Sequence, residues 1–402
     1  MSGHQDVLII GAGPAGLALA CALADRGLAV TLLERQARAA LAAPQDDGRE
    51  IALTHRAVGI LETLGLWQRF DTRDIAPIRA ARVLDGTSSG YLGFEPSGSG
   101  LDALGYLVPN HVIRKAAFDA ALSRPSVRLR DDARIEHLSV DADAARVQLA
   151  GGETLSAPLL VAADSRFSDT RRQLGIGAEQ RDFGRTVIVC RLAHDGPADS
   201  IAYECFGYGR TLAMLPLNDR QVSAVVTVSS DQTGALLRMP PGAFAASLQQ
   251  QFGTRLGRLR LIGERYSYPL VAVYAHRFAT QRAVLIGDAA VGMHPVTAHG
   301  YNLGLYGVDS LARTLGNARQ CGQDLGDLAV LAQYEREHRR ASRPLYLGTN
   351  ALVGLYTDER APARLLRGAV LRIAERLPPL KAAITHQLTG TRRSSITPPI
   401  LR

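Results

Sequence analysis

RAVLIGDAAVGMHPVTAHGYNLGL, residues 282–305, is the stretch from which the fold of this 402-residue chain can be worked out. Ala283–Ile286 predict a short buried strand that stops at Gly287-Asp288, and Pro and Gly then mark a loop before a helix that begins near Asn302. A helix N-terminus that follows Gly-rich backbone presents free N–H groups and the positive end of the helix dipole. The stretch therefore predicts a site for an anionic group such as a phosphate.

A second loop of this kind lies at the opposite end of the chain, in DVLIIGAGPAGLALACALADRGLAVTLLER, residues 6–35. It predicts a strand at Asp6–Ile10, a tight turn, a helix and a second strand at Ala29–Leu33. In dinucleotide-binding units the glycines allow the turn, the close approach of a pyrophosphate and the packing of the helix, and an acid after the second strand binds a ribose 2′-hydroxyl. The residues with this pattern here are Gly11, Gly13, Gly16 and Glu34. Two such loops predict one extended dinucleotide ligand.

The same N-terminal region could be mistaken for a targeting segment. Val7–Ala24 is a run of uncharged residues, which is also typical of a signal peptide or a membrane span. However, Met1–Gln5 contain no Lys or Arg, and three glycines and Pro14 interrupt the apolar run. We therefore expect a buried strand and helix, in a protein of the cytoplasm or the inner face of the membrane.

Composition narrows the remaining function classes. The four cysteines, Cys21, Cys190, Cys205 and Cys321, lack CxxC spacing and are expected to be buried apolar residues, with no metal site and no disulfide framework. The net charge of the whole chain is +8, and residues 336–402 contain thirteen Lys or Arg against four Asp or Glu. A basic tail can meet an anionic membrane surface, an acidic partner or nucleic acid. No nucleic-acid motif accompanies it, which favours the first two.

Periodicity predicts the order of the other elements. We expect helices at Ile51–Trp67, His111–Arg124 and Gly242–Phe252, and a series of helices after Tyr334 that break at Pro344, Pro362 and Pro378-Pro379. Strands are expected in residues 78–108, in a meander at Val127–Leu149, at Leu159–Ala163, in residues 183–230 with a hairpin turn at Asn218-Asp219, and at Leu259–Val273.

This order of elements and five motifs resemble the group A flavoprotein monooxygenases, which share the para-hydroxybenzoate hydroxylase fold. Within that group the chain is similar to the ubiquinone-biosynthesis hydroxylases over nearly its full length. The motifs are GAGPAGLALA (11–20), DGREIALTHRAVGILETLGLW (47–67), LLVAADSRFSDTRRQLGI (159–176), LAMLPL (212–217) and the GD stretch with NLGL (287–305). The C-terminal region from residue 335 onward is similar to that family's tail too.

The resemblance implies an α/β fold in which a Rossmann-type FAD-binding domain is interleaved with a mixed β-sheet substrate domain and is followed by a C-terminal helical tail. The FAD-binding domain would comprise residues 1–80, 111–182 and 276–335. The substrate domain would comprise strands in residues 81–110 and a sheet in residues 183–275, and the basic helical region would be residues 336–402.

The resemblance also implies the residues that bind FAD. The ADP half would be bound by Gly11, Gly13, Ala15, Gly16, Glu34 and Arg35. Arg49 and Arg114 would contact the flavin or its phosphates, and Asp288 would contact the ribityl or pyrophosphate region. The flavin N1/O2 edge would lie by the backbone of Gly300, Tyr301 and Asn302, where helix-end donors stabilise negative charge. The other implied cofactor-binding residues are Asp164, Gly287 and Pro295. The alternatives are that Arg49 and Arg114 are surface charges and that Asp288 is only a helix cap.

Two positions depart from the family pattern. The family's Asp-Gly dipeptide is Asp164-Ser165 here, and a positive φ at the second position would strain a serine. The family's Gly-Gln-Gly is Ala298-His299-Gly300 here, so an imidazole replaces an amide beside the expected flavin. His299 is the candidate catalytic residue, as a proton shuttle; the alternative is a hydrogen-bonding spacer the size of glutamine.

The implied reaction is hydroxylation of an aromatic ring through a flavin C4a-hydroperoxide, with O₂ as co-substrate and NADH or NADPH as transient reductant. The implied substrate is a prenylated phenol or quinol of ubiquinone biosynthesis, and other proteins of that pathway are implied partners. Met214, Leu215 and Pro216 would cover the substrate, or else only pack in the sheet core. Another aromatic metabolite as substrate, or a non-catalytic flavin-binding subunit, are the alternatives.

The basic tail could bring the protein to the membrane, where a prenylated substrate would lie. A helical stripe of apolar residues lies beside four arginines, which suits peripheral binding to an anionic membrane surface. The stripe comprises Leu365, Leu366, Ala369, Val370, Ile373 and Leu377, and the arginines are Arg364, Arg367, Arg372 and Arg376. The alternative is that the stripe packs on the rest of the protein.

Overall fold

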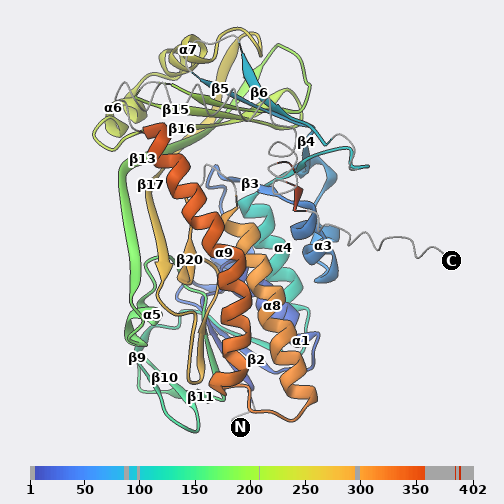
Figure 1. Ribbon diagram of the computed structural model, residues 1–402, viewed down its shortest axis with the longest axis vertical. Coiled ribbons are helices and arrows are strands. Elements are labelled where there is room, and N and C mark those ends of the chain that lie inside the picture. The colour runs from blue at the N-terminus through green and yellow to red at the C-terminus, as the bar shows by residue number, and fades with distance from the viewer. Residues whose placement is uncertain are drawn as a thin grey trace, which may run out of the picture.

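The computed structural model describes residues 5–85, 90–96, 100–207, 209–294, 299–357, 385 and 389–390. Its two main sheets lie at opposite ends of the long axis, and helices α1, α4, α8 and α9 pack beside the lower one in Figure 1. The mixed α/β fold expected from the sequence is confirmed.

The six-stranded sheet is built around the N-terminal strand. Its order is β18 (Ala279–Thr280), β19 (Ala283–Leu285), β12 (Leu159–Ala162), β1 (Val7–Ile10), β2 (Val30–Leu33) and β8 (Val127–Arg130), and only β18 is antiparallel to its neighbour. All residues of β1, β2 and β12 are buried, as expected for parallel strands covered on both faces. Helix α1 (Pro14–Ala24) has Pro14 in its first turn, where a missing N–H costs no hydrogen bond.

The expected meander at residues 127–149 was wrong in its first strand. β8 pairs in parallel with β2 in the six-stranded sheet, whereas the meander comprises β9 (Ile135–Val140), β10 (Ala145–Leu149) and β11 (Thr154–Ala157). The preceding helix α4 (Asn110–Leu122) serves as the crossover that returns the chain parallel to β2. A short strand after a helix does not reveal its partner.

The eight-stranded sheet has the order β20 (Val291–Gly292), β17 (Leu259–Ala275), β13 (Ala178–His194), β16 (Gln221–Ser229), β15 (Thr211–Pro216), β14 (Ile201–Phe206), β5 (Ala80–Asp85) and β6 (Tyr91–Phe94). The hairpin turn expected at Asn218-Asp219 is confirmed between β15 and β16, where Asp219 and Arg220 have positive φ. Helices α6 (Thr233–Arg238) and α7 (Pro241–Phe252) lie at the outer end of the molecule in Figure 1.

The two faces of this sheet have different surroundings. Ile188, Cys190 and Met214 pack in one apolar cluster with Phe244 and Phe252 of α7. The alternating residues face the other way, toward the part of the chain that carries the glycine loops, because successive side chains of a strand point to opposite faces. On that second face Tyr268 of β17 donates a hydrogen bond to the carbonyl of Asp47 and Arg191 of β13 pairs with Glu50.

Residues 51–67 do not form the single helix that their apolar spacing predicts. Residues 50–53 form strand β3 (Glu50–Leu53) of a three-stranded sheet with β7 (Gly105–Pro109) and β4 (Ala76–Ile78), and helix α3 (His55–Thr63) begins only after Thr54. The Thr54 hydroxyl accepts from the Ala57 N–H and so caps α3. Short 3₁₀ turns at Trp67–Arg69 and Thr72–Asp74 follow.

Two long helices complete the described chain, α8 (Gly300–Gln320) and α9 (Leu328–Thr357). The expected break at Pro344 was wrong, since α9 continues through it. A proline inside a helix costs about 3 kcal/mol, and packing on both sides of it offsets that cost. Ser342 hydrogen-bonds Tyr274 at 3.2 Å, and the buried Tyr346 packs on the Tyr274 ring with centroids 4.9 Å apart.

The cysteines are buried with one exception. Cys21, Cys190 and Cys205 are buried in the cores, as expected, but Cys321 is exposed at the end of α8. All four are free thiols. The remaining predicted breaks, at Pro362 and Pro378-Pro379, and the apolar stripe of the tail lie outside the described residues.

Candidate cofactor and active site

The glycine loop after β1 has the geometry of a phosphate-binding turn. Gly11 has φ +106°, and a Cβ there would lie 2.5 Å from the carbonyl oxygen of Ala163. A Cβ at Gly16 would lie 2.0 Å from the carbonyl oxygen of Gly11, so both positions require glycine. A Cβ at Gly13 would meet nothing within 4 Å, and no side chain caps α1. Open space thus lies before uncapped helix donors, which fits a pyrophosphate.

Glu34 lies where a ribose-binding acid is expected, directly after β2. Its carboxylate accepts from the N–H of Ala12, inside the glycine loop, at 2.8 Å and from the N–H of Gln36 at 2.9 Å. These two bonds fix the side chain beside the loop, where only 9% of the residue is exposed. Arg35 is exposed. The arrangement fits the ADP half of FAD.

The GD turn lies directly against this loop. Gly287 has φ +56°, and a Cβ there would come 3.1 Å from the Cβ of Ala15; a Cβ at Gly304 of α8 would lie 3.8 Å from the Gly287 Cα. Two motifs about 270 residues apart are therefore in contact. Asp288 lies inside a 3₁₀ turn, Gly287–Ala289, and does not cap a helix.

Asp288 is paired with a residue that sequence reasoning missed. The Arg166 guanidinium donates to the Asp288 carboxylate from Nη2 at 2.8 Å and from Nε at 3.2 Å, and also to the carbonyl of Val271 at 3.0 Å. Arg171, which is 1% exposed, donates to the carbonyl of Ala289 at 2.9 Å. Both arginines belong to the motif that contributed Asp164. Spacing alone does not tell which arginine turns inward.

Asp164 and Ser165 have mainly local roles in this structure. The Asp164 carboxylate accepts from the Ser168 hydroxyl at 2.6 Å and from the Thr170 N–H at 3.3 Å, which holds the start of α5 (Asp169–Gln173). The strain expected at Ser165 is absent, because Ser165 is not among the residues with positive φ. Serine is therefore compatible with the backbone at this position.

The N-terminus of α8 is held by its own asparagine. Asn302, which is 1% exposed, accepts from the Thr54 N–H at 3.0 Å and donates to the Ala52 carbonyl at 2.8 Å. Thr54 is in turn 2.6 Å from the Tyr306 hydroxyl. A Cβ at Gly300 would meet nothing within 4 Å, and no side chain caps α8. Among the described residues, nothing therefore fills the space before the first-turn N–H groups of this rigidly held helix, which would suit a flavin edge.

Three further predicted residues belong to this end of α8. His299 directly precedes the helix and is 5% exposed. Burial raises the pKa of the Tyr301 hydroxyl. Pro295 lies outside the described residues.

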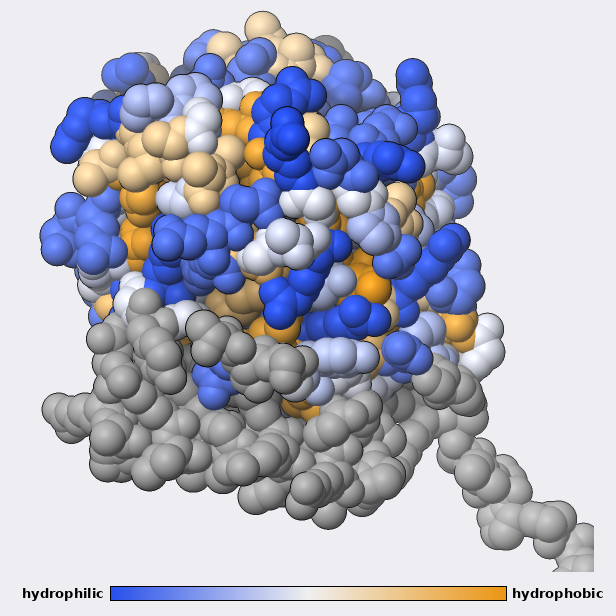
Figure 2. All heavy atoms as spheres, turned by 90° about the horizontal axis from the view of Figure 1, so that it is seen from above, coloured by the Kyte–Doolittle hydropathy of each residue, from blue (hydrophilic) through white to orange (hydrophobic). Residues whose placement is uncertain are grey.

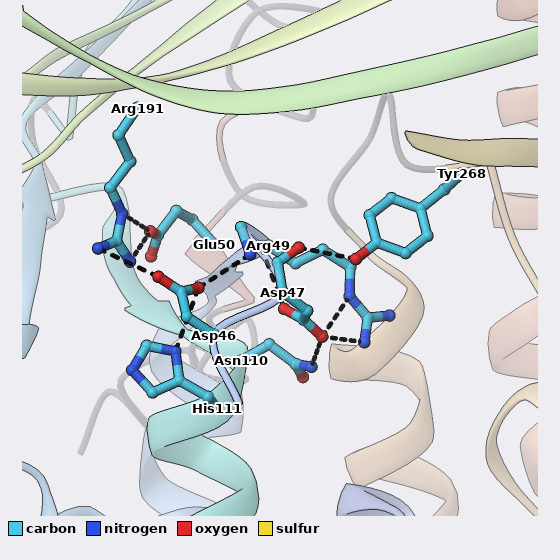
Figure 3. Close-up of polar contacts among 9 residues, drawn as sticks. Asp46, Asp47, Arg49, Glu50, Asn110, His111, Arg191 and Tyr268 are labelled. Carbon is cyan, nitrogen blue, oxygen red and sulfur yellow. Dashed lines mark hydrogen bonds and ion pairs between the residues drawn. The ribbon is translucent and has the colours of Figure 1, made fainter. Parts of the chain in front are cut away.

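A polar cluster joins the β3 loop, the start of α4 and the eight-stranded sheet (Figure 3). The Arg49 guanidinium lies 2.5 Å from the Asp47 carboxylate and 5.2 Å from the centre of the Tyr268 ring. Asn110 donates to the same carboxylate at 2.7 Å, and these hydrogen bonds and the Arg49 charge lower the pKa of Asp47 although burial opposes the shift. Although burial acts in the opposite direction, the negative charge of Asp288 also helps to raise the pKa of Arg49, so the two side chains lie close enough to interact electrostatically.

The other half of this cluster is centred on Glu50. Arg191 of β13 donates two hydrogen bonds to one Glu50 oxygen, at 2.7 and 2.9 Å, and lies 3.5 Å from Asp46, which in turn lies 3.5 Å from His111. The Glu50 side chain is 1% exposed, and burial raises its pKa although Arg191 opposes the shift. These contacts fix the eight-stranded sheet to the segment that carries Arg49.

Arg114 lies one turn after Asn110 on α4. It is half-buried, and within the described part of the chain no carboxylate pairs with it. An unpaired guanidinium on this helix fits the predicted contact with the cofactor phosphates.

The predicted substrate residues on β15 divide between the two faces of the sheet. Met214 is fully buried in the cluster with α7, so for Met214 the structure supports core packing. Leu215 is half-buried on the opposite face, beside Leu92 and Leu107. Pro216 is buried at the end of the strand. Leu215 remains the substrate candidate of the three.

Fold and site together have the features of an FAD-binding flavoprotein, namely two glycine turns in contact, an acid after the second strand and an uncapped N-terminus at α8. The family model described as FAD binding domain matches residues 4–346. The chain belongs to this family, and it is an FAD-dependent monooxygenase.

Individual relatives agree with this assignment. The chain is 47% identical over 394 residues to "Ubiquinone hydroxylase UbiM" of Neisseria meningitidis, covering 97% of this chain and 86% of that protein. It is 36% identical to "Ubiquinone hydroxylase UbiL" of Rhodospirillum rubrum, covering 98% and 92%. Among solved structures, p-nitrophenol 4-monooxygenase PnpA of Pseudomonas putida has the same fold, with a TM-score of 0.76, 18% identity and coverage of 98% and 100%.

The Arg166–Asp288 pair generates a prediction about cofactor retention. Asp288→Asn removes the charge that holds Arg166 beside the GD turn, and we expect at least tenfold weaker FAD binding, since hydrogen bonds to charged groups contribute about 1.5–3 kcal/mol. The measurement is FAD affinity by fluorescence titration of the apoprotein. Asp309→Asn, which alters a carboxylate of α8 that pairs with Arg313, is the control. Equal affinities in both variants would show that the pair does not serve the cofactor.

Proposed function

We propose that this enzyme hydroxylates the aromatic ring of a prenylated phenol or quinol in ubiquinone biosynthesis, with O₂ as co-substrate and NADH or NADPH as reductant. The observation that carries the proposal is the 47% identity to a ubiquinone hydroxylase over 97% of the chain. A second relative, 29% identical over 94% of the chain, is the "3-demethoxyubiquinol 3-hydroxylase" of Escherichia coli. Both relatives are named as hydroxylases of a ubiquinone or ubiquinol compound.

The described residues fit the cofactor that this reaction needs. Glu34 and the open turn at Gly13 would hold the ADP half of FAD, and Asp288 with Arg166 would hold the ribityl and pyrophosphate region. The first turn of α8 would face the flavin. When bound, FAD supplies the redox chemistry that activates O₂. The protein orients the aromatic ring, excludes water and controls the proton of its hydroxyl.

The test uses the purified protein and a deletion strain. We expect the protein to bind FAD non-covalently and the strain to accumulate a ubiquinone precursor that lacks one or more ring hydroxyls. Mass spectrometry of the quinone pool identifies that precursor, and the purified enzyme should hydroxylate it. A normal quinone pool with intact FAD binding would favour another aromatic substrate. A bound flavin that NADH and NADPH cannot reduce, together with no hydroxylation, would favour a non-catalytic subunit.

His299 is proposed as a residue that activates the substrate or moves its proton. It is buried directly before α8, whose backbone donors would face the flavin. His299→Gln restores the family's residue type and should leave FAD binding unchanged. Turnover should fall about 10²-fold or more if the imidazole acts as an acid or base. The measurement is kcat against pH for both forms, and unchanged values throughout would make His299 a spacer.

The C-terminal tail is proposed to bring the enzyme to its substrate at an anionic membrane surface. Within the described residues, no helix has the length and apolar character needed to cross a bilayer. A polyprenyl chain leaves the bilayer at a cost of about 0.8 kcal/mol per exposed CH₂. The apolar stripe and arginines of residues 364–377 would allow the enzyme to reach such a substrate from the surface.

Charge reversal tests the tail better than truncation does. Thr389 is 2% exposed, and a Cβ at Gly390 would lie 2.9 Å from the Thr54 hydroxyl, so truncation would also disturb the cluster that holds α8. We expect replacement of Arg364, Arg367, Arg372 and Arg376 by Glu to weaken binding to vesicles containing phosphatidylglycerol about 10²-fold or more. Binding should be lost in high salt.

The control for charge reversal changes four exposed arginines elsewhere, Arg128, Arg134, Arg258 and Arg260, to Glu. This variant has the same change in net charge and should retain most vesicle binding. Equal binding by both variants would refute the role of the tail, and a fall in the melting temperature of the tail variant alone would favour packing of the stripe on the protein.

A further inference from the structure

Glu204 lies on the inward face of the eight-stranded sheet. Its neighbours on β14, Tyr203 and Cys205, both pack in the cluster with Phe252 of α7. Because side chains alternate along a strand, Glu204 points to the opposite face, which is the face that carries Leu215 and Tyr268. In register, Glu204 lies beside Ala213 of β15 and Val83 of β5.

The surroundings of Glu204 are apolar. Val83, Ala202 and Leu215 on this face pack with Leu92, Phe94 and Leu107 in one cluster. In the part of the chain that the structure describes, Glu204 has no hydrogen bond or ion pair. Burial raises the pKa of its carboxyl to about 8. By surface area the residue is half-buried, so part of the side chain stays accessible on this face.

Two charged residues of the β5 segment share the face of Glu204. Asp85 lies two residues beyond Val83, diagonally from Glu204, and Arg79 directly precedes the strand, whereas the facing residues of β15 and β6 are uncharged. On β13, three strands away, Arg191 is paired with Glu50 and Arg185 donates to the carbonyl of Gly209. No charged group contributes to the shift, so desolvation alone causes it.

We propose that Glu204 is the acid–base group that accepts the hydroxyl proton of the bound phenol or quinol. This inference rests on the proposed function, since it names the residue that would activate the aromatic ring. An apolar face on which the Glu204 carboxyl has no partner among the described residues matches a substrate with an apolar body and one hydroxyl at the reacting end. An unpaired carboxyl in apolar surroundings also lowers stability, as residues retained for function commonly do.

The proton balance is simple. The phenolic O–H bond breaks, its proton moves to a Glu204 oxygen, and the electron pair stays on the ring and makes the ring carbon more nucleophilic. After that carbon has gained the hydroxyl group that FAD and O₂ would supply, its C–H bond breaks, its proton leaves to solvent and the C–H electron pair restores the aromatic ring. Glu204 then returns the proton it took to the ring oxygen. A base with a pKa near the working pH suits this exchange with a phenol, whose ordinary pKa is about 10.

The first test is the pH dependence of catalysis by the FAD-loaded enzyme. For the wild type, kcat/KM should rise with pH through about 8, the pKa at which Glu204 loses its proton. Glu204→Gln should lower kcat/KM about 10²-fold or more and remove this rise. Glu204→Asp keeps the carboxyl and should retain the pH-dependent limb. Glu264→Gln, which changes an exposed carboxyl of β17, is the control and should behave like the wild type.

The second test does not depend on turnover. Affinity of the FAD-loaded enzyme for phenol, which stays protonated near pH 8 because its ordinary pKa is about 10, should change with pH near 8 when it is measured by the perturbation of the flavin absorbance. Glu204→Gln should abolish the change and weaken binding about tenfold or more. A raised carboxyl pKa means that the folded protein keeps a proton that the unfolded chain has lost, so stability falls as pH rises between the ordinary carboxyl value and about 8. The melting temperature of Glu204→Gln should therefore exceed that of the wild type increasingly over this range.

The outcomes separate the two proposals. Wild-type hydroxylation of a ubiquinone precursor with an unchanged pH profile in Glu204→Gln would overturn the role of Glu204. No hydroxylation by the wild type, together with the expected pH-dependent binding of phenol, would overturn the proposed function and support Glu204 as a phenol-binding acid–base group. If Glu204→Gln fails to retain FAD, the Glu204→Asp profile decides, and loss of the pH-dependent limb in that folded variant would contradict the proposal.

Discussion

The contact between Gly287 and Ala15 is the constraint on which the site depends. It brings the loop after β1 and the loop after β19 to within van der Waals distance, and a side chain at residue 287 would separate them. The positive φ of Gly287 then turns Asp288 toward Arg166. Asn302 makes a second connection between distant segments, since its side chain hydrogen-bonds the backbone of Ala52 and Thr54 and so fixes the start of α8 to β3. Three separate segments thus share one set of close backbone contacts.

Local signals were sufficient for much of this fold. The β1–α1–β2 unit, the GD turn and the hairpin at Asn218-Asp219 were predicted because glycine, proline and turn residues restrict the backbone wherever they occur. The predictions that were wrong concern segments whose structure is determined by tertiary contacts. Residues 51–53 form a strand that pairs with β7, although their apolar spacing predicts a helix. Strand β8 pairs with β2 and not with the strands that follow it. Helix α9 continues through Pro344 because residues around it pack on Tyr274.

The candidate site shows the same division. Gly11, Glu34 and Asp288 could be proposed from motifs, but the pairing of Asp288 with Arg166 depends on a side chain from another loop. The face to which a strand residue points depends on register, which is why Met214 and Leu215 could not be separated by sequence. Glu204 carried no motif at all. Its significance comes from an apolar face assembled from β5, β6, β7, β14 and β15, which no local pattern shows.

The two longest strands have a consequence for how the molecule unfolds. β13 and β17, with 17 residues each, pair along nearly their whole length and run from the six-stranded end to the outer sheet (Figure 1). Viewed from above, the apolar residues of the described part lie in patches between hydrophilic ones (Figure 2). The paired strands β13 and β17 contribute to both ends of the molecule. Unfolding of one end would therefore break backbone hydrogen bonds that also stabilise the other end. The six-stranded and eight-stranded sheets should therefore lose their structure together when the chain unfolds.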